Sequence, residues 1–197
     1  MQVTFATQNQ GKLAELRALV VGLPIAVRCL SDAGVHTQAD ETGQTFGQNA
    51  LLKAAHAARL TAGWALADDS GLCVDALAGA PGLHSARWSG QGDDGNNRLL
   101  IEKLQGLPRA KRSARYRCAL ALCHAGGEQF LVEGEVEGII TEAARGQGGF
   151  GYDPLFEISA WGLTFGEVEA TRKQEISHRA LAFQKLLPVL TLLAPPC

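Results

Sequence analysis

The sequence predicts an α/β fold with a mixed sheet and flanking helices, forming one domain over residues 1–197. Three observations lead to this prediction. Strands and helices alternate in the first half, a long hairpin pattern occupies the second half, and no repeat, low-complexity tract or linker divides the 197 residues. Alternation favours parallel strands, and the hairpin adds antiparallel ones. Because the hairpin is long and central, it allows two lobes around a cleft.

The chain opens with a strand, a polar loop and a helix. "VTFAT" (3–7) is rich in β-formers, and 11–23 carries leucines and valines at helical spacing. A second helix is expected from Thr45, where Thr45-x-x-Gln48 forms a capping-box pattern, to Gly63.

The remaining elements follow in order. "WALADD" (64–69) predicts a buried strand, and an acidic start predicts a helix over 93–107. The β-rich runs 114–125 and 128–141 form a hairpin, and a glycine-loaded loop leads into another strand within 146–158. A final helix is expected from an N-cap at Ser177, with a kink or break near Pro188.

Composition narrows the function classes. With a formal net charge of −2, the chain has no overall attraction to a polyanion, so we expect no nucleic-acid partner. No apolar run approaches the length of a membrane span, and the first residues carry no export pattern, so we expect no membrane partner and a cytoplasmic location. Five scattered cysteines, with no C-x-x-C pair, favour reduced thiols over a zinc site or disulfides.

The loop "TQNQGK" (7–12) is the first candidate for phosphate binding. A polar loop between a strand and a helix directs backbone N–H groups and the positive helix end at an anion. The alternative is that Asn9 only caps the helix and Lys12 is solvated. A Walker A motif is absent, which disfavours a P-loop NTPase.

The second helix and the loop before it offer further polar groups. Asn49 and Lys53 are four residues apart and share one face of the helix, which could line a cleft. Lys53 alone could equally extend to solvent, and Glu41 alone could be a surface acid.

Asp68 and Asp69 stand side by side at the end of the predicted strand. Adjacent carboxylates repel, so we expect a positive group nearby. In a regular strand they point to opposite faces, so both serve one site only if the strand breaks at Ser70-Gly71. Mg²⁺ held by carboxylates and substrate phosphates, with Glu41 as a third acid, would relieve the repulsion. An Asx-turn at Asp69 is the alternative.

Two late segments suggest a nucleobase pocket. Aromatic residues in the loop "FGYDP" (150–154) can stack on a base, and His178 and Arg179 can donate to its carbonyl edge. Taken singly, Phe150 and Tyr152 could be packing residues and His178-Arg179 a solvated first turn. A metal-assisted hydrolysis of a phosphate anhydride uses all of these groups together.

Five motifs resemble those of the inosine/xanthosine triphosphate pyrophosphatases, the Ham1-like family. They are "TQNQGK", "ETGQTFGQNALLKA", "ADDSGLCVDALAGAPGLHSARWSG", "GFGYDP" and "ISHRA", in order and over nearly the whole chain. The resemblance implies hydrolysis of ITP, dITP and XTP to the monophosphate and pyrophosphate, which clears deaminated purines from the nucleotide pool. It also implies an elongated mixed fold with a central active-site cleft between two lobes, Mg²⁺ dependence and a homodimer.

The resemblance also implies residue roles. Asp69 would be the general base and a metal ligand, with Glu41 and Asp68 as further acids around Mg²⁺. The residues implied to hold the triphosphate are Thr7, Asn9, Lys12, Lys53 and Ser70, and those around base and sugar are Phe150, Tyr152, Asp153, Lys173, His178 and Arg179.

The chain departs from the family pattern in two places. Gln48 replaces the usual glutamate, which should affect only the capping box, and the acidic pair that often precedes Lys173 is missing, which leaves the positioning of Lys173 open. Three alternatives are considered. A haloacid-dehalogenase-like phosphatase would need a D-x-D motif that is absent, and a non-catalytic nucleotide-binding protein would not need three acids. A Maf-type nucleotide pyrophosphatase of different base preference is the nearest enzymatic alternative.

Overall fold

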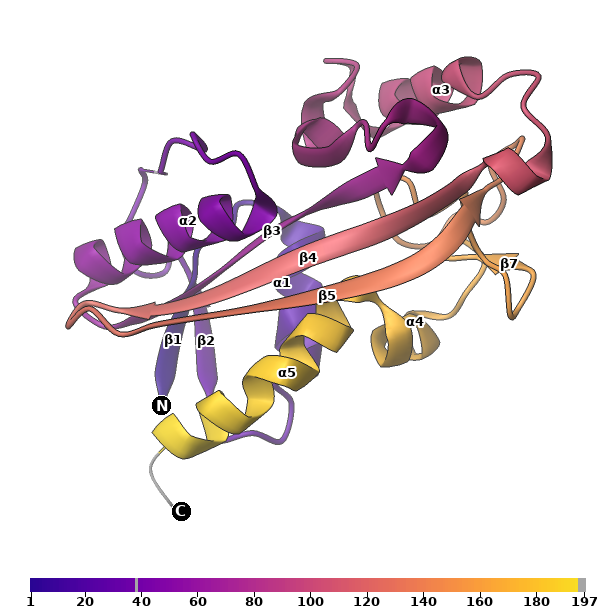
Figure 1. The fold of residues 1–197 in the computed structure, drawn as a ribbon. Helices are drawn as coiled ribbons and strands as arrows, with labels where there is room; N and C mark the ends of the chain where they lie inside the picture. Colours follow the sequence, from indigo (N-terminus) through magenta and orange to yellow (C-terminus); the bar gives the residue numbers. More distant parts are fainter. Residues whose placement is uncertain (38, 195–197) are drawn as a thin grey trace. The chain divides into compact units, whose positions relative to one another are not determined.

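The computed structural model describes residues 1–37 and 39–194, and within them it contains a seven-stranded sheet in the order β2-β1-β3-β4-β5-β6-β7 (Figure 1). β1 pairs in parallel with β2 and β3, whereas β6 pairs antiparallel with β5 and β7, so the predicted mixed sheet is confirmed. The strands are β1 (Gln2–Phe5), β2 (Ala26–Cys29), β3 (Trp64–Val74), β4 (Ser113–His124), β5 (Gln129–Ile140), β6 (Phe156–Ile158) and β7 (Leu163–Thr164). The helices are α1 (Gln10–Leu19), α2 (Phe46–Thr61), α3 (Gly92–Lys103), α4 (Ala170–Ile176) and α5 (His178–Leu193).

The chain divides into two compact units. The first unit comprises Met1–Asp69, Cys118–Gly134 and the chain from Arg179 onward, and the second comprises Ser70–Arg117 and Glu135–His178. Each of the long strands β3, β4 and β5 contributes one part to each unit. The cleft predicted from the sequence stays a prediction.

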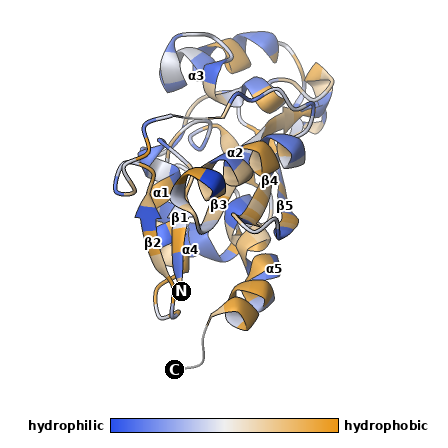
Figure 2. Cartoon of the chain, turned by 90° about the vertical axis from the view of Figure 1, so that its left-hand side faces the viewer, coloured by the Kyte–Doolittle hydropathy of each residue, from blue (hydrophilic) through white to orange (hydrophobic). Residues whose placement is uncertain are grey.

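In the first unit the sheet is covered on both faces. One face packs on α1 and α5 through a cluster that includes Leu13, Leu66 and Phe183. The other face packs on α2 through small residues, among them Ala54 and Ala67. Figure 1 shows α2 on one side of β1 and β3, with α1 and α5 on the other, and Figure 2 shows that α5 is hydrophobic over much of its length. The alternation of β3 therefore sends successive side chains toward different helices.

The ends of α2 follow their sequence signals with two differences. The Thr45 hydroxyl caps the helix by accepting from the Gln48 backbone N–H (3.1 Å), as predicted. The Gln48 side chain accepts from the N–H of Gln44 (2.7 Å), one residue before the position that a capping box uses. At the other end, Ala62 adopts the left-handed conformation (φ 50°), so the helix ends one residue before the expected Gly63.

The second unit has its own hydrophobic core. Tyr116 lies against Phe156 (ring centroids 4.6 Å apart) and Phe165 (6.2 Å), and Leu100 of α3 is fully buried in the same cluster. This core supports α3, α4 and the glycine-rich loop that precedes β6.

Several elements differ from the sequence prediction. α1 ends at Leu19 instead of residue 23, because Gly22 adopts a positive φ (82°) and Pro24 disfavours a helical residue before it. β3 does not break at Ser70-Gly71 but continues to Val74, and α5 continues through Pro188. The sequence patterns did not reveal β2, β7 or α4.

Two further expectations concern membranes and thiols. Among the described helices, none combines the length and apolar character that crossing a bilayer requires. The described cysteines, Cys29, Cys73, Cys118 and Cys123, are free thiols, two of them buried and two half-buried. Cys197 lies outside the described residues.

Candidate active site

The two adjacent aspartates lie on β3 just beyond the end of β1. Beyond the paired residues of β1 and β3, the Ala6 N–H donates a hydrogen bond to the Leu66 carbonyl (2.7 Å). Asp68 and Asp69 follow on β3. Both are buried, at 2% and 8% exposure. Buried carboxylates require compensating charge or hydrogen bonds, and each finds it on a different side of the strand.

Asp68 shares the face of Leu66 and meets two cations. Its Oδ2 atom accepts from Lys12 Nζ (3.0 Å) and from Arg179 Nη2 (2.9 Å). Arg179 is 1% exposed and also pairs with Glu15 of α1. Burial alone would raise the pKa of Asp68, but the charges of Lys12 and Arg179 outweigh it and hold this pKa far below its usual range. Asp68 is therefore ionised whenever the protein is folded at ordinary pH.

Asp69 shares the face of Ala67 and meets residues of α2. Its Oδ1 atom accepts from Lys53 Nζ (2.9 Å), and its Oδ2 atom accepts from Asn49 Nδ2 (3.2 Å). Lys53 also donates to Glu41 Oε1 (3.0 Å). Burial raises the pKa of Asp69 above its ordinary value, while Lys53 opposes the rise. The same ammonium thus joins two of the three acids predicted for the site.

The unbroken strand does not separate the two acids electrostatically. Lys53 also lowers the pKa of Asp68, and Lys12 also lowers that of Asp69. Since β1 stops at Phe5, groups from both faces of β3 act on one charged centre. The sequence argument required a break in β3 for both aspartates to act at one centre. In the structure β3 is unbroken, and the aspartates act at one centre because the neighbouring strand β1 ends beside them.

The loop after β1 starts α1 at the same centre. Asn9 Oδ1 accepts from the backbone N–H of Lys12 (3.0 Å), and Thr7 Oγ1 accepts from the N–H of Asn9 (3.1 Å). Asn9 is thus the N-cap of α1, but Lys12 is not solvated as the alternative interpretation supposed, because it pairs with Asp68. Ser70 continues β3 after Asp69 and is half-buried.

The second unit holds most of the residues predicted for base and sugar. Asp153 Oδ2 accepts from Lys173 Nζ (2.6 Å) and from the backbone N–H of Phe150 (3.0 Å). Lys173 lies over the Phe150 ring, 4.9 Å from its centroid. Lys173 and Asp153 are buried, at 6% and 2% exposure, so this ion pair fixes the position of Lys173, which the sequence left open. Phe150 itself is half-buried.

The other predicted base contacts have distinct surroundings. His178 is 5% exposed and stacks on Tyr116, with centroids 4.7 Å apart and planes 9° apart. Tyr152 is buried and donates its hydroxyl to the Ser85 carbonyl (2.9 Å). Arg179 belongs to the first unit and pairs with Asp68 and Glu15.

Sequence reasoning missed two of these partners. Glu15 stands three residues after Lys12 on the same face of α1, a spacing that could have placed it near the site but not predicted its pairing with Arg179. Tyr116 carried no comparable signal, because its contact with His178 joins segments distant in the chain.

The side chains at this site supply only part of the ligand set that a magnesium ion needs. Among the described residues, no group of three or more acidic, histidine or cysteine side chains forms a ready metal site. Glu41 and Asp69, however, bring two carboxylates to the single ammonium of Lys53. Mg²⁺ is commonly bound by one or two carboxylates plus substrate phosphates and water, so this donor set suits it.

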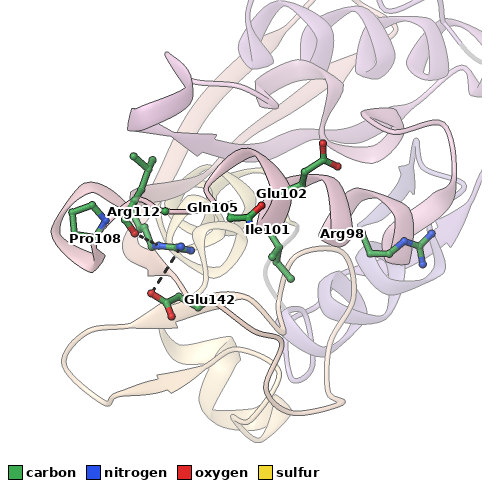
Figure 3. Close-up of a pocket in the computed structure, with 9 residues that line it drawn as sticks. Arg98, Ile101, Glu102, Gln105, Pro108, Arg112 and Glu142 are labelled. Carbon is green, nitrogen blue, oxygen red and sulfur yellow. Dashed lines mark hydrogen bonds and ion pairs between the residues drawn. The ribbon is translucent and has the colours of Figure 1, made fainter.

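A separate pocket of about 780 Å³ lies in the second unit beside the end of α3 (Figure 3). Arg112 lines it, but its guanidinium donates to the carbonyls of Leu104 (3.0 Å), Leu107 (3.0 Å) and Thr141 (3.3 Å). It thereby satisfies the end of α3. The residues that line this pocket include none of those predicted for the site, so we do not assign the active site to it.

Comparison with known proteins gives this arrangement a family. A model of the Ham1 family matches residues 3–189. The chain belongs to the Ham1 family. Among curated members of similar sequence, the dITP/XTP pyrophosphatase of Geobacter sulfurreducens is 46% identical over 187 residues, covering 94% of each chain. That of Bacillus licheniformis is 45% identical over 191 residues, covering 96% of this chain and 97% of its own.

Solved Ham1 structures have the same fold. A HAM1 protein from Coxiella burnetii superposes with a TM-score of 0.88 at 38% identity, covering 98% of this chain and 99% of its own. A dITP/XTP pyrophosphatase from Mycobacterium abscessus gives a TM-score of 0.76 at 41% identity, covering 95% and 100%. The α/β mixed sheet with flanking helices is therefore the fold of the family.

Proposed function

We propose that this Ham1 protein hydrolyses the non-canonical purine nucleotides ITP, dITP and XTP to the monophosphate and pyrophosphate, and so clears deaminated purines from the nucleotide pool. One observation carries the proposal: two buried aspartates of β3, just beyond the end of β1, are each paired with a lysine that can also contact phosphate. The names of the relatives, dITP/XTP pyrophosphatase at 45–46% identity over most of the chain, support the substrate class.

The positive groups account for binding of the triphosphate. Lys12 and Lys53 are mostly buried, with side-chain exposures of 17% and 14%, so their charges are weakly screened by solvent. The N-terminal turn of α1, after Thr7 and Asn9, adds backbone N–H groups that favour an anion. Together with Ser70, these residues hold the triphosphate.

Asp69 is the general base in this proposal. Asn49 and Lys53 each occupy one of its carboxylate oxygens, and a carboxylate oxygen can accept a second hydrogen bond, so Asp69 can still receive the proton of an attacking water. The two donors fix the orientation of the carboxylate. The water then attacks a phosphorus atom of the α–β phosphate anhydride. Cleavage of the P–O bond between the α and β phosphates releases pyrophosphate.

Glu41 and Asp69, with Asp68 as a further acid, would hold Mg²⁺. When bound, the ion would neutralise phosphate charge and increase the acidity of a bound water. The chain itself holds Asp68 between Lys12 and Arg179, and it orients Asp69 through Lys53.

The residues predicted to surround the base explain the selection of 6-oxo purines. Phe150 stacks on the base, while Lys173, His178 and Arg179 supply donors and Tyr152 and Asp153 complete the pocket. Hypoxanthine and xanthine present a carbonyl acceptor where adenine presents an amino donor. Donors facing adenine would lose their partners, so ATP should be a poor substrate.

The proposal also includes a homodimer located in the cytoplasm, where the nucleotide pool lies, without nucleic-acid or membrane partners. The dimer rests on the family resemblance, and the lack of a nucleic-acid partner rests on the net charge of −2. The comparisons do not favour a Maf-type enzyme or a non-catalytic nucleotide-binding protein.

The test is a product assay with purified protein, Mg²⁺ and each of ITP, dITP, XTP, GTP and ATP. We expect IMP and pyrophosphate from ITP, corresponding products from dITP and XTP, and far slower turnover of ATP. Orthophosphate as the first product of ITP, or equal turnover of ATP and ITP, would refute the proposal.

A further inference from the structure

Two side chains of α3 hold the backbone of Gly151 in the loop that carries Phe150. The N–H of Gly151 donates to Asp93 Oδ2 (2.8 Å), and Asn97 Nδ2 donates to the Gly151 carbonyl (2.9 Å). Asp93 and Asn97 are four residues apart and therefore lie on the same face of the helix. Both polar groups of one residue are thus bound by a helix more than fifty positions earlier in the chain.

The loop around Gly151 can adopt its conformation only because it is rich in glycine. Gly149 and Gly151 have positive φ angles of 73° and 63°. A Cβ atom on Gly149 would lie 1.9 Å from Asp153 Oδ2, so no side chain fits there. Glycine is flexible in the unfolded and unbound loop, so a defined shape needs external bonds.

Those bonds fix three successive residues. Phe150 donates its N–H to Asp153, Gly151 is held by Asp93 and Asn97, and Tyr152 donates its hydroxyl to the Ser85 carbonyl. Asp93 is exposed, so its bond to Gly151 contributes little to the core. Its main structural effect falls on the loop.

We propose that Asp93 and Asn97 are positioning residues that hold the Phe150 loop in the conformation that receives the purine base. This inference rests on the proposed function, because it assigns Phe150 to the base. A loop that is already ordered does not lose conformational freedom when the nucleotide binds. Loosening it should weaken binding of the base in ground state and transition state alike, which raises KM and leaves kcat nearly unchanged.

The variants Asp93→Ala and Asn97→Ala test this proposal. We expect each to raise the KM for ITP about tenfold, with kcat within about twofold of the wild type. Asp93→Asn should restore most of the wild-type KM, because the amide oxygen can still accept from Gly151. Asp94→Ala is the matched control, because it removes a carboxylate from the same first turn of α3 but not the one that binds Gly151.

A competitor without a base separates positioning from general damage. The inhibition constant of inorganic triphosphate, a ligand for the phosphate-binding residues alone, should be equal in wild type and variants. The proposal would be overturned if the variants weakened binding of ITP and of inorganic triphosphate to the same extent. It would also be overturned if the KM for ITP were unchanged in both alanine variants.

Hydrogen exchange provides a readout that does not depend on turnover. Amides of residues 149–152 should exchange faster in Asp93→Ala than in wild type or Asp94→Ala, and IMP should bind more weakly by calorimetry. Unchanged exchange would refute the positioning role. If the wild type failed to hydrolyse ITP but these differences appeared, the proposed function would fail while the inferred role of α3 in holding the loop would stand.

Discussion

The neighbouring aspartates Asp68 and Asp69 have different partners in this protein, and we propose different roles for them. Asp68 is completely surrounded by protein and faces Lys12 and Arg179, whereas Asp69 has one lysine and one amide. Replacing Asp68 with asparagine would leave two cations without their full counter-charge, which costs about 3 kcal/mol or more in stability. We therefore interpret Asp68 mainly as an electrostatic anchor and Asp69 as the reactive carboxylate.

The variant Asp69→Asn tests this division of roles. The amide keeps the shape of the side chain but cannot take up a proton, so we expect kcat for ITP to fall by at least about 100-fold. Circular dichroism and a melting curve should remain close to those of the wild type. Near-normal turnover would remove Asp69 as the base, and a large drop in melting temperature would make the loss of activity uninformative about catalysis.

Glu157 of β6 offers a pH-dependent prediction away from the site. Its buried carboxylate accepts from Arg109 and from Arg145 Nη2 (2.7 Å). The hydrogen bonds from Arg109 are the main reason that the pKa of Glu157 lies below its ordinary value of 4.5, and burial opposes them. Because the folded pKa is lowered, this stabilisation is complete above the unfolded pKa and is lost as the pH falls through the folded pKa.

The variant Glu157→Gln should therefore lower the free energy of unfolding by about 1–3 kcal/mol at neutral pH. The gap to the wild type should shrink as the pH falls below 4.5. Urea unfolding at neutral pH and below pH 4.5 measures this difference in the free energy of unfolding, with the exposed Glu175→Gln variant as the control. A gap that is absent at neutral pH, or equal at both, would contradict this account.

At the residue scale, sequence patterns singled out acids and lysines that the structure brings together, but they did not predict the geometry of the pairs. Glu41 and Asp69 share the ammonium of Lys53, and the charge argument had predicted a positive group beside the aspartates. The position of Arg179 could not be foreseen, since its pairing with Asp68 depends on packing of segments 111 residues apart. Long-range contacts of this kind leave no local pattern.

At the scale of secondary-structure elements, helix ends show how local signals compete. Ala62 ends α2 in a left-handed conformation that costs about 1–2 kcal/mol for a residue with a Cβ atom. A glycine at position 62 would avoid this cost, but the glycine of this segment is one residue later, at position 63. The strained residue at position 62 lets β3 begin at Trp64.

The variant Ala62→Gly should stabilise the protein by about 0.5–1 kcal/mol, after the greater flexibility of glycine in the unfolded chain is subtracted. Ala55→Gly, in the interior of the same helix, should destabilise it by about 1 kcal/mol. Chemical denaturation of both variants measures the two effects. Changes of the same sign would contradict the assigned helix end.

The elements that sequence patterns missed are short or depend on neighbours. β2 and β7 have four and two residues, too few for a periodic signal, and α4 has seven. β3 continues through Ser70 and Gly71 although this dipeptide favours a turn. Long elements with strong periodicity, such as α2 and the β4–β5 hairpin, were predicted to within a few residues.

At the scale of the whole molecule, each compact unit holds a different set of the residues predicted for the site. The first unit holds the acids, the lysines and the start of α1, and the second holds Phe150, Asp153, Lys173 and His178. The strands β3, β4 and β5 each contribute residues to both units. The order of the five sequence motifs predicted the family, and the Ham1 match over residues 3–189 confirms that prediction.

The most direct test of the central claim is hydrolysis of ITP by the wild-type protein with Mg²⁺ in ¹⁸O-labelled water, followed by mass spectrometry of the products. Attack by water on the α–β anhydride predicts equal amounts of IMP and pyrophosphate, with one labelled oxygen in one of them. Formation of IDP with labelled orthophosphate would contradict the account.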